Sequence, residues 1–236
     1  MTEDSAAITG EDVKHISKVL RMQSGDRVML SDGCGYEYLA EIEAISRERV
    51  ELKLLDKKMC PAEPKQRITL YQGIPKAGKM ELIIQKCVEL GINGIIPVAA
   101  ERSVVRVKPG EYKAKQTRYQ RVACEAAKQS GRGIIPQVSW AGDFTAVLDI
   151  AVKKDLGLFM YETGEREKLD DVLSANKDIA TAAIITGPEG GFAQFEADLA
   201  RVCKLHICSM GERILRCETA PVVALTAAMY ATGNLS

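Results

Sequence analysis

The pattern of apolar residues changes at two prolines, Pro61 and Pro64, and this change limits the fold more than any other feature of the chain. Before it, over residues 25–58, apolar and polar residues alternate, as they do in strands with one buried face. After it, short β-branched runs alternate with helical patterns, which is typical of a mostly parallel sheet covered on both faces. We therefore predict an α/β protein with two domains, residues 1–64 and residues 65–236.

The first domain is predicted to be a small β-barrel-like module with one helix. Three runs, DRVMLSD, YEYLAEIEAIS and RVELKLLD, are typical of strands in a meander. The helix is expected in GEDVKHISKVLRM, because Val13, Ile16, Val19 and Leu20 recur at helical spacing and would share one buried face.

The second domain is predicted to alternate strands and helices to its end. The expected strands are ITLYQG, GIIPVA, LGLFMYE, ATAAIIT and HICSMG, and the last expected helix is ETAPVVALTAAMYA. In open sheets of this kind, ligands bind beyond the carboxyl ends of the strands. The loops that follow the late strands are therefore the first place to look for a site.

One of these loops is unusually rich in glycine. In IITGPEGGFAQFE, the strand ends at Thr186, and Gly187, Pro188, Gly190 and Gly191 follow it. Glycine lets a ligand lie against the backbone. The loop lacks the Lys and Ser/Thr of a phosphate-binding P-loop, and Glu189 would repel the pyrophosphate of a dinucleotide, so neither motif fits.

A second loop, SMGERILRCETA, also follows a strand, and it leads into the last helix. It carries Arg213, Arg216 and Glu218. Backbone groups freed at two such loops suit a small cofactor with an adenine edge and a ribose. The alternative is that GPEGG is only a tight turn and that Arg216 and Glu218 form a surface ion pair.

Composition narrows the functional classes. Lys plus Arg and Asp plus Glu each number 32, and this zero net charge argues against binding nucleic acid by bulk charge but not by a local basic patch. The seven cysteines are scattered without a C-x-x-C pair, which favours reduced thiols over a zinc site. The N-terminus is acidic, unlike a signal peptide, and no apolar run is long enough to span a membrane, so we expect a cytoplasmic protein.

The two loops carry a family resemblance. TGPEGGF followed by MGERILRCETA resembles the motif pair of the RsmE family of 16S rRNA uridine N3-methyltransferases, in the SPOUT superfamily. ITGEDVKHISKVLRMQSGDRV, KAGKMELIIQKCVELGINGIIPV and EAAKQSGRGIIPQV resemble the same family, so the resemblance covers nearly the whole chain. The chain departs from the family where it begins MTEDSAA instead of with an aromatic and basic strand, and where Lys14-His15 replaces a His-His doublet.

The resemblance implies a PUA-like RNA-binding domain over residues 1–64 and a SPOUT α/β-knot domain, with a deep trefoil knot, over residues 65–236. It also implies S-adenosylmethionine (SAM) as the cofactor, a homodimer, and N3 of uridine 1498 in 16S rRNA of the small ribosomal subunit as the target. We expect no metal. The cofactor-binding residues implied by the two motifs are Thr186, Gly187, Pro188, Glu189, Gly190, Gly191, Met210, Gly211, Ile214, Leu215, Arg216, Thr219 and Ala220.

The implied reaction assigns roles to the charged residues. Uracil N3 must lose its proton before it can attack, which spreads negative charge onto O2 and O4. Arg213 or Arg216 can hold that charge, and Glu218 or Glu189 can accept the proton. We expect Arg216 and Glu218 to be the catalytic residues.

The target base must be unpaired, because N3 lies on its Watson–Crick edge. Candidate RNA-binding residues are Arg21, Lys76, Lys79, Arg121, Lys128 and Arg132. The homodimer is expected to be held largely by the C-terminal domain, because its last helix is apolar around nearly its whole circumference. The alternative is that this helix is buried in the core on all sides. Two other functions stay open: a SPOUT methyltransferase acting on another RNA such as tRNA, and a non-catalytic RNA-binding assembly factor.

Overall fold

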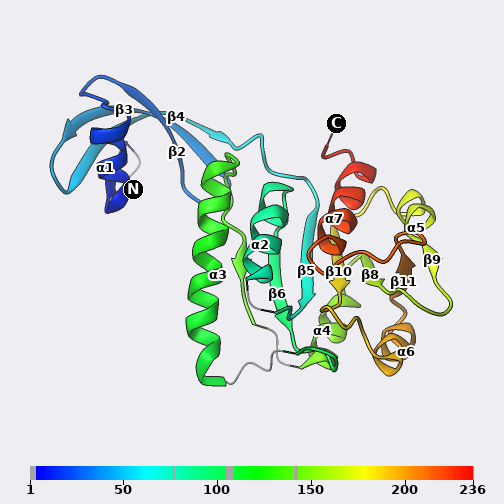
Figure 1. Cartoon of the computed structure of the whole chain (residues 1–236). Coiled ribbons are helices and arrows are strands. Elements are labelled where there is room, and N and C mark those ends of the chain that lie inside the picture. The colour runs from blue at the N-terminus through cyan, green and yellow to red at the C-terminus, as the bar shows by residue number, and fades with distance from the viewer. Residues whose placement is uncertain (1–3, 77, 105–108, 141–142, 236) are drawn as a thin grey trace. The chain divides into compact units, whose positions relative to one another are not determined.

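The structure, a computed structural model, describes residues 4–76, 78–104, 109–140 and 143–235 (Figure 1). The chain forms two compact units. One comprises Met1–Glu63 and Arg132–Ile134, and the other comprises Pro64–Gly131 and Ile135–Ser236. No helix in the described part of the chain is long and apolar enough to cross a membrane.

The first unit is a four-stranded antiparallel sheet with strand order β1-β4-β3-β2. Its hydrophobic core is formed by buried side chains of the strands and of the short helix, such as Val13, Ile42 and Leu52. Strand β1 pairs with β4, and the sequence pattern does not predict it. The elements are β1 (Ser5–Thr9), α1 (Glu11–Lys14), a π-helical turn η1 (His15–Val19), β2 (Arg27–Ser31), β3 (Tyr36–Ile45) and β4 (Arg49–Met59).

The helix of this unit differs from its predicted phase. Val13 and Ile16 are buried as the pattern predicts, but Val19 is 66% exposed and Leu20 is 54% exposed. The α-helix ends at Lys14 and continues as a π-helical turn, which has more residues per turn. The later residues therefore rotate away from the face that the α-helical spacing predicts, so the prediction for Val19 and Leu20 is wrong.

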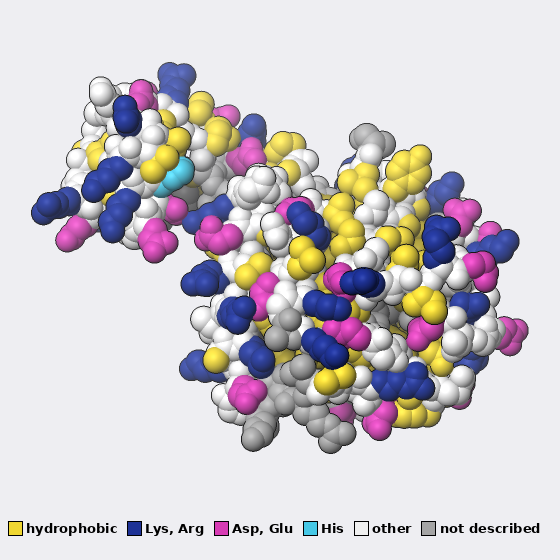
Figure 2. All heavy atoms as spheres, viewed as in Figure 1, with side chains coloured by type: hydrophobic (Ala, Val, Ile, Leu, Met, Phe, Trp, Pro, Cys, Tyr) yellow, Lys and Arg dark blue, Asp and Glu magenta, His cyan; other side chains and the backbone are white. Residues whose placement is uncertain are grey.

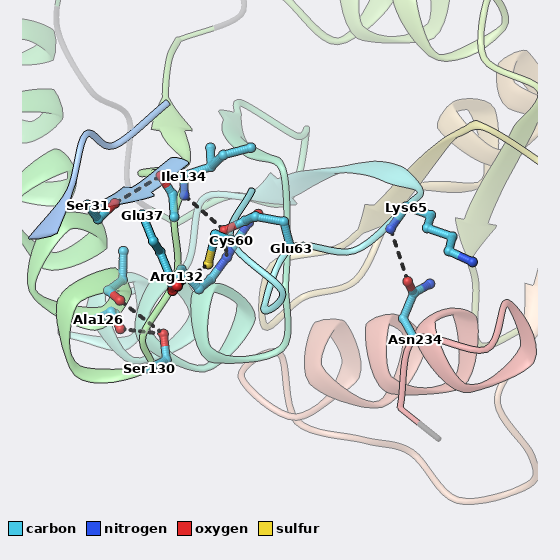
Figure 3. A network of polar contacts seen from close by, with 12 residues as sticks. Ser31, Glu37, Cys60, Glu63, Lys65, Ala126, Ser130, Arg132, Ile134 and Asn234 are labelled. Carbon is cyan, nitrogen blue, oxygen red and sulfur yellow. Dashed lines mark hydrogen bonds and ion pairs between the residues drawn. The ribbon is translucent and has the colours of Figure 1, made fainter. Parts of the chain in front are cut away.

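A buried ion pair ties residues 132–134 to the rest of the first unit (Figure 3). The Arg132 guanidinium donates to both carboxylate oxygens of Glu63, with Nη2 2.6 Å from Oε2, and the two side chains are 3% and 13% exposed. The Ile134 backbone N–H donates to the same carboxylate at 2.8 Å. Gly133 packs against Cys60 so closely that a Cβ at Gly133 would lie 2.4 Å from the Cys60 Cβ.

The second unit is built on a seven-stranded parallel sheet with strand order β7-β6-β5-β10-β8-β11-β9. The late strand β10 lies between β5 and β8, which are far from each other in the sequence. The strands are β5 (Arg67–Gly73), β6 (Gly94–Val98), β7 (Gln137–Val138), β8 (Leu156–Met160), β9 (Glu167–Lys168), β10 (Thr181–Thr186) and β11 (His206–Ser209).

Helices cover both faces of this sheet. One core cluster joins helices α2, α3, α5 and α7 to one face, and the other joins α4 and α6 to the opposite face. Strand alternation divides the two clusters: Ile184 faces the first, and Ala183 and Ile185 face the second. The helices are α2 (Lys79–Glu89), α3 (Pro109–Gln129), α4 (Phe144–Ala151), α5 (Leu169–Ala175), α6 (Gln194–Val202) and α7 (Ala220–Ala231).

The Arg132–Glu63 pair gives a stability prediction. Arg132→Met should lower the free energy of unfolding of the first unit by about 3–5 kcal/mol, because it leaves a buried carboxylate without its cation. Hydrogen exchange of the amides in β2, β3 and β4 measures this loss. The matched control is Arg49→Met, which breaks an exposed pair with Glu51 at 3.5 Å and should cost less than about 1 kcal/mol. Equal protection in both variants would contradict the prediction.

Candidate active site

A pocket of about 550 Å³ lies at the carboxyl edge of the parallel sheet, where the loops after β8, β10 and β11 come together. This volume is typical of a site for a small molecule or cofactor. All of its lining residues belong to the second unit. They are Lys79, Met160, Tyr161, Glu162, Arg166, Thr186, Gly187, Pro188, Glu189, Gly191, Ser209, Met210, Gly211, Glu212, Arg213, Ile214, Leu215, Arg216, Cys217 and Ala220.

The glycine loop after β10 needs its glycines for backbone geometry and for space. Gly191 has a φ of +64°, and its N–H donates to the Pro188 carbonyl at 2.9 Å. A Cβ at Gly191 would lie 2.0 Å from the Glu162 carboxylate, and one at Gly187 would lie 3.1 Å from the Gly191 Cα. Gly190 differs, because its Cβ would meet Arg102, which does not line the pocket.

A buried polar pair anchors the same loop to β5. The Thr186 hydroxyl donates to the Gln72 side-chain carbonyl at 2.7 Å, and Gln72 Nε2 donates to the Gly187 carbonyl at 3.0 Å. Both side chains are fully buried, and these bonds satisfy their polar groups. At Gly73, an added Cβ would lie 2.5 Å from Pro188 Cδ and 2.6 Å from Pro188 N. The first turn of the loop therefore packs directly on the end of β5.

One ammonium bridges the two loops. Lys79, the first residue of α2, places Nζ 3.2 Å from Glu189 Oε1 and 3.0 Å from Glu218 Oε2. The Lys76 backbone N–H donates to both carboxylate oxygens of Glu189 as well. Glu189 belongs to the glycine loop, and Glu218 belongs to the loop before α7. The start of α2 and both loops therefore meet at this ammonium.

The contacts between Lys79, Glu189 and Glu218 shift the pKa values of all three side chains. Hydrogen bonds to Glu218 and then Glu189 raise the pKa of Lys79. The hydrogen bond from Lys79 lowers the pKa of Glu218 to about 2. Partial burial opposes ionisation of Glu189, but hydrogen bonds from backbone N–H groups and from Lys79 outweigh it, and its pKa is lowered. All three groups are therefore charged at neutral pH.

Cys217 lies against the same cluster. Its thiol donates to Glu218 Oε2 at 3.2 Å, and its Sγ is 3.6 Å from Lys79 Nζ. Burial first, and then the hydrogen bond to Glu218, raise its pKa to about 12. The thiol is therefore a protonated donor and not a nucleophile at neutral pH. Cys217 forms no disulfide.

The pocket contains every cofactor-binding residue implied by the two motifs except Gly190 and Thr219. It also contains residues that the sequence does not assign to cofactor binding, among them Lys79, Cys217 and, at the end of β8 and in the segment after it, Met160, Tyr161, Glu162 and Arg166. Glu162 supplies a carboxylate there, directly against Gly191. The order of strands explains why the segment was missed: β8 lies between β10 and β11, and no pattern in the sequence indicates that order.

The two residues expected to be catalytic have different surroundings. Arg216 is exposed and lines the pocket, and its carbonyl accepts from the N–H groups of Thr219 and Ala220 at the start of α7. Glu218 is held by Lys79, and a carboxylate with a pKa of about 2 is a weak base. The expectation that Glu218 accepts a proton does not fit this environment. Within the described residues, no three metal-binding side chains gather into a cluster.

The candidate RNA-binding residues divide into two groups. Arg21, Lys76, Arg121 and Lys128 are exposed. Arg132 is 5% exposed and paired with Glu63, and Lys79 is engaged by two carboxylates, so neither is available to a phosphate and both predictions need correction. On the face of the second unit drawn in Figure 2, Lys and Arg side chains are interspersed with Asp and Glu.

Comparison with known proteins gives matches over nearly the whole chain. Residues 62–229 match the family described as RNA methyltransferase domain, and residues 8–55 match the family described as RNA methyltransferase PUA domain. A Bacillus subtilis protein named ribosomal RNA small subunit methyltransferase E is 34% identical over 230 residues, which are 96% of this chain and 90% of that protein. A Synechocystis protein of the same name is 32% identical over 224 residues, which are 94% of this chain and 72% of that protein.

A solved structure agrees with these matches. It is a ribosomal RNA small subunit methyltransferase E from Neisseria gonorrhoeae bound to S-adenosyl methionine. Its TM-score is 0.86 at 28% identity, and the match covers 98% of this chain and 93% of that chain.

The lowered pKa of Glu218 predicts how stability depends on pH. Its folded-state value of about 2 lies below the ordinary value of 4.5, so its ion pair stabilises the fold fully above about pH 4.5 and is lost as the pH falls toward 2. Glu218→Gln should therefore lower the melting temperature by a few degrees at most at pH 7. The difference from the unsubstituted protein should shrink below about pH 4.5. A difference that stays constant with pH, measured by thermal melts, would contradict this assignment.

Proposed function

The chain belongs to the ribosomal RNA small subunit methyltransferase E family and is a SAM-dependent rRNA methyltransferase, and we propose that it methylates N3 of uridine 1498 in 16S rRNA. The observation that carries the proposal is the junction of the glycine loop and the loop before α7 in one pocket. These are the two loops whose sequences resemble the motif pair of uridine N3-methyltransferases.

The pocket fits SAM in its volume and in its lining. Gly187 and Gly191 leave space where a side chain would collide with neighbouring backbone or with Glu162, and this space lets a ligand approach the main chain. Glu162 presents a carboxylate that suits ribose hydroxyls, because Glu189 and Glu218 are both engaged by Lys79. Backbone N–H and C=O groups of the loops suit the adenine edge. When bound, SAM supplies an electrophilic methyl group on a sulfonium.

We assign Arg216 to the charge that develops on the uracil ring. It lies in the wall of the pocket with an exposed guanidinium, and its position is set by the backbone bonds that start α7. A fixed cation near O2 or O4 stabilises the deprotonated base and so lowers the barrier to attack by N3. Because Glu218 is a weak base, the proton is proposed to leave to water or to a group of the RNA.

The two units divide the work in this proposal. The first unit matches the PUA family and would hold RNA, with Arg21 among its exposed cations. Arg121 and Lys128 of α3 and Lys76 would add phosphate contacts from the second unit. We infer that the substrate is the small ribosomal subunit or its rRNA, and that the protein acts in the cytoplasm.

We also infer a homodimer that forms through α7. This helix buries Ala224, Leu225 and Ala228 but leaves Val223 38% exposed and Tyr230 73% exposed, and hydrophobic side chains gather over it (Figure 2). A trefoil knot is the second fold-level inference, supported by the family and by the insertion of β10 between β5 and β8. Light scattering that gives a monomer at micromolar concentration would contradict the dimer.

The decisive experiment maps methylation in RNA. Small ribosomal subunits from a strain that lacks this gene should gain one N3-methyluridine, at position 1498, when they are incubated with the purified protein and SAM. The methyl group blocks Watson–Crick pairing, so reverse transcription should stop at that position, and mass spectrometry of nucleosides should identify it. Arg216→Ala should lower kcat by about 10²-fold or more. Methylation of tRNA instead, or SAM binding without methylation, would support the alternative functions.

Gly73 gives a sharper test of the cofactor pocket. Gly73→Ala places a methyl group against Pro188 and must displace the glycine loop, so the dissociation constant for SAM should rise by about tenfold or more. Titration calorimetry measures the constant, and circular dichroism checks the fold. The matched control is Gly110→Ala in α3, where an added Cβ meets nothing within 4 Å and SAM affinity should not change. Equal affinities in the two variants would argue against the assigned pocket.

A further inference from the structure

We propose that Lys79 is a positioning residue that holds the two walls of the SAM pocket together. This inference rests on the proposed function, because it gives Lys79 a task at the SAM site. We call Glu189, Lys79 and Glu218 the loop clamp. Glu189 comes from the glycine loop, and Glu218 comes from the loop before α7. The loops follow different strands, β10 and β11, which are separated in the sheet by β8.

The contacts of the ammonium match its chemistry. An ammonium has three N–H donors, and Nζ of Lys79 has three acceptors within reach: Glu189 at 3.2 Å, Glu218 at 3.0 Å and the Cys217 sulfur at 3.6 Å. One acceptor belongs to the first loop and two belong to the second. The side chains of the clamp are only 33%, 21% and 19% exposed for Lys79, Glu189 and Glu218. The ammonium is therefore a link between loops and not a freely solvated charge.

The base of the lysine is fixed in place. Lys79 starts α2 directly after Gly78, which has a φ of +87°. Met80, Ile83 and Ile84 of the same helix are buried in the core of the second unit. The Lys76 backbone N–H also holds the Glu189 carboxylate from the other side, at 3.1 and 3.2 Å. The clamp therefore fastens two loops to a rigid helix.

Two other roles for Lys79 fit the structure less well. A contact with an RNA phosphate is disfavoured because two carboxylates surround the ammonium and would repel a phosphate. Proton transfer is disfavoured because the carboxylates raise the pKa of Lys79, which stays protonated at neutral pH. A link between the loops requires only a permanent cation with several donors.

The loop clamp should affect the affinity for SAM more than the rate of methyl transfer. The glycine loop and the loop before α7 both line the pocket, so a change in their separation alters the contacts that these loops would make with the cofactor. Removal of the clamp should therefore weaken SAM binding, while the barrier to methyl transfer from bound SAM changes little. The loss should lie in the KM for SAM and not in kcat.

The test compares three substitutions in the full-length protein. Lys79→Met should raise the dissociation constant and the KM for SAM by about tenfold or more, because it removes charge-assisted hydrogen bonds to both loops. Lys79→Arg keeps a cation with several donors and should restore most of the affinity. Lys86→Met is the matched control: Lys86 lies on the same helix and pairs with Glu89 at 2.8 Å, but that pair links no loops.

A double substitution separates the clamp from a general loss of stability. Glu218→Gln removes one end of the clamp and should weaken SAM binding in the same direction as Lys79→Met. The combination of the two should bind SAM about as well as Lys79→Met alone, because both remove the same link. Additive losses would overturn the proposal, and this readout stays informative where Lys79→Met lowers the melting temperature.

Two further results would overturn the proposal. The first is an unchanged dissociation constant for SAM in a folded Lys79→Met variant. The second is a loss of kcat, or a changed shape of its pH profile between pH 6 and pH 9, at saturating SAM. A failure of the unsubstituted protein to bind SAM would instead refute the proposed function, so the two failures are distinguishable.

Discussion

Parallel pairing of β10 with both β5 and β8 brings the glycine loop to the centre of the sheet edge. The register places Thr186 opposite Gln72, and the buried hydrogen bond between their side chains fixes the point at which the chain leaves the sheet. Gly73 then packs on Pro188 without room for a side chain. The pocket depends on this pairing, because the loops after β8 and β11 form its other walls, and β8 pairs with β10 on one side and with β11 on the other.

The Lys79 ammonium offsets the negative charge of two carboxylates at the pocket. The carboxylates of Glu162, Glu189 and Glu212 line the pocket, Glu218 borders it, and Lys79 engages Glu189 and Glu218. This arrangement limits the negative field that would otherwise act on a bound sulfonium and hold it in its ground state. It also makes Glu218 a weak base, so the proposed methylation of a uracil depends more on the cation that we assign to the deprotonated ring, Arg216.

The first unit uses a residue from far along the chain. Arg132 follows α3 in the sequence, yet its guanidinium is buried against Glu63 and belongs to the first unit. When only the sequence is read, the same arginine resembles a surface cation, because the helical pattern places it on one face with Arg121 and Lys128. A buried ion pair of this kind specifies where residues 132–134 lie, because a misplaced segment would leave both charges unpaired.

The sequence by itself determined the fold class, the approximate extents of most strands and the two loops of the site, because these depend on apolar periodicity and on short glycine-rich motifs. The family followed from the same two motifs. The sequence did not predict the π-helical turn that exposes Val19, and it did not predict strand β1. The sequence also did not reveal the roles of Lys79, Glu162 and Arg132. The partner of Arg132 lies 60 or more residues away in the chain, and the partners of Lys79 lie over 100 residues away. Such contacts are decided by strand order and by the pairing of buried charges, and only the tertiary structure contains them.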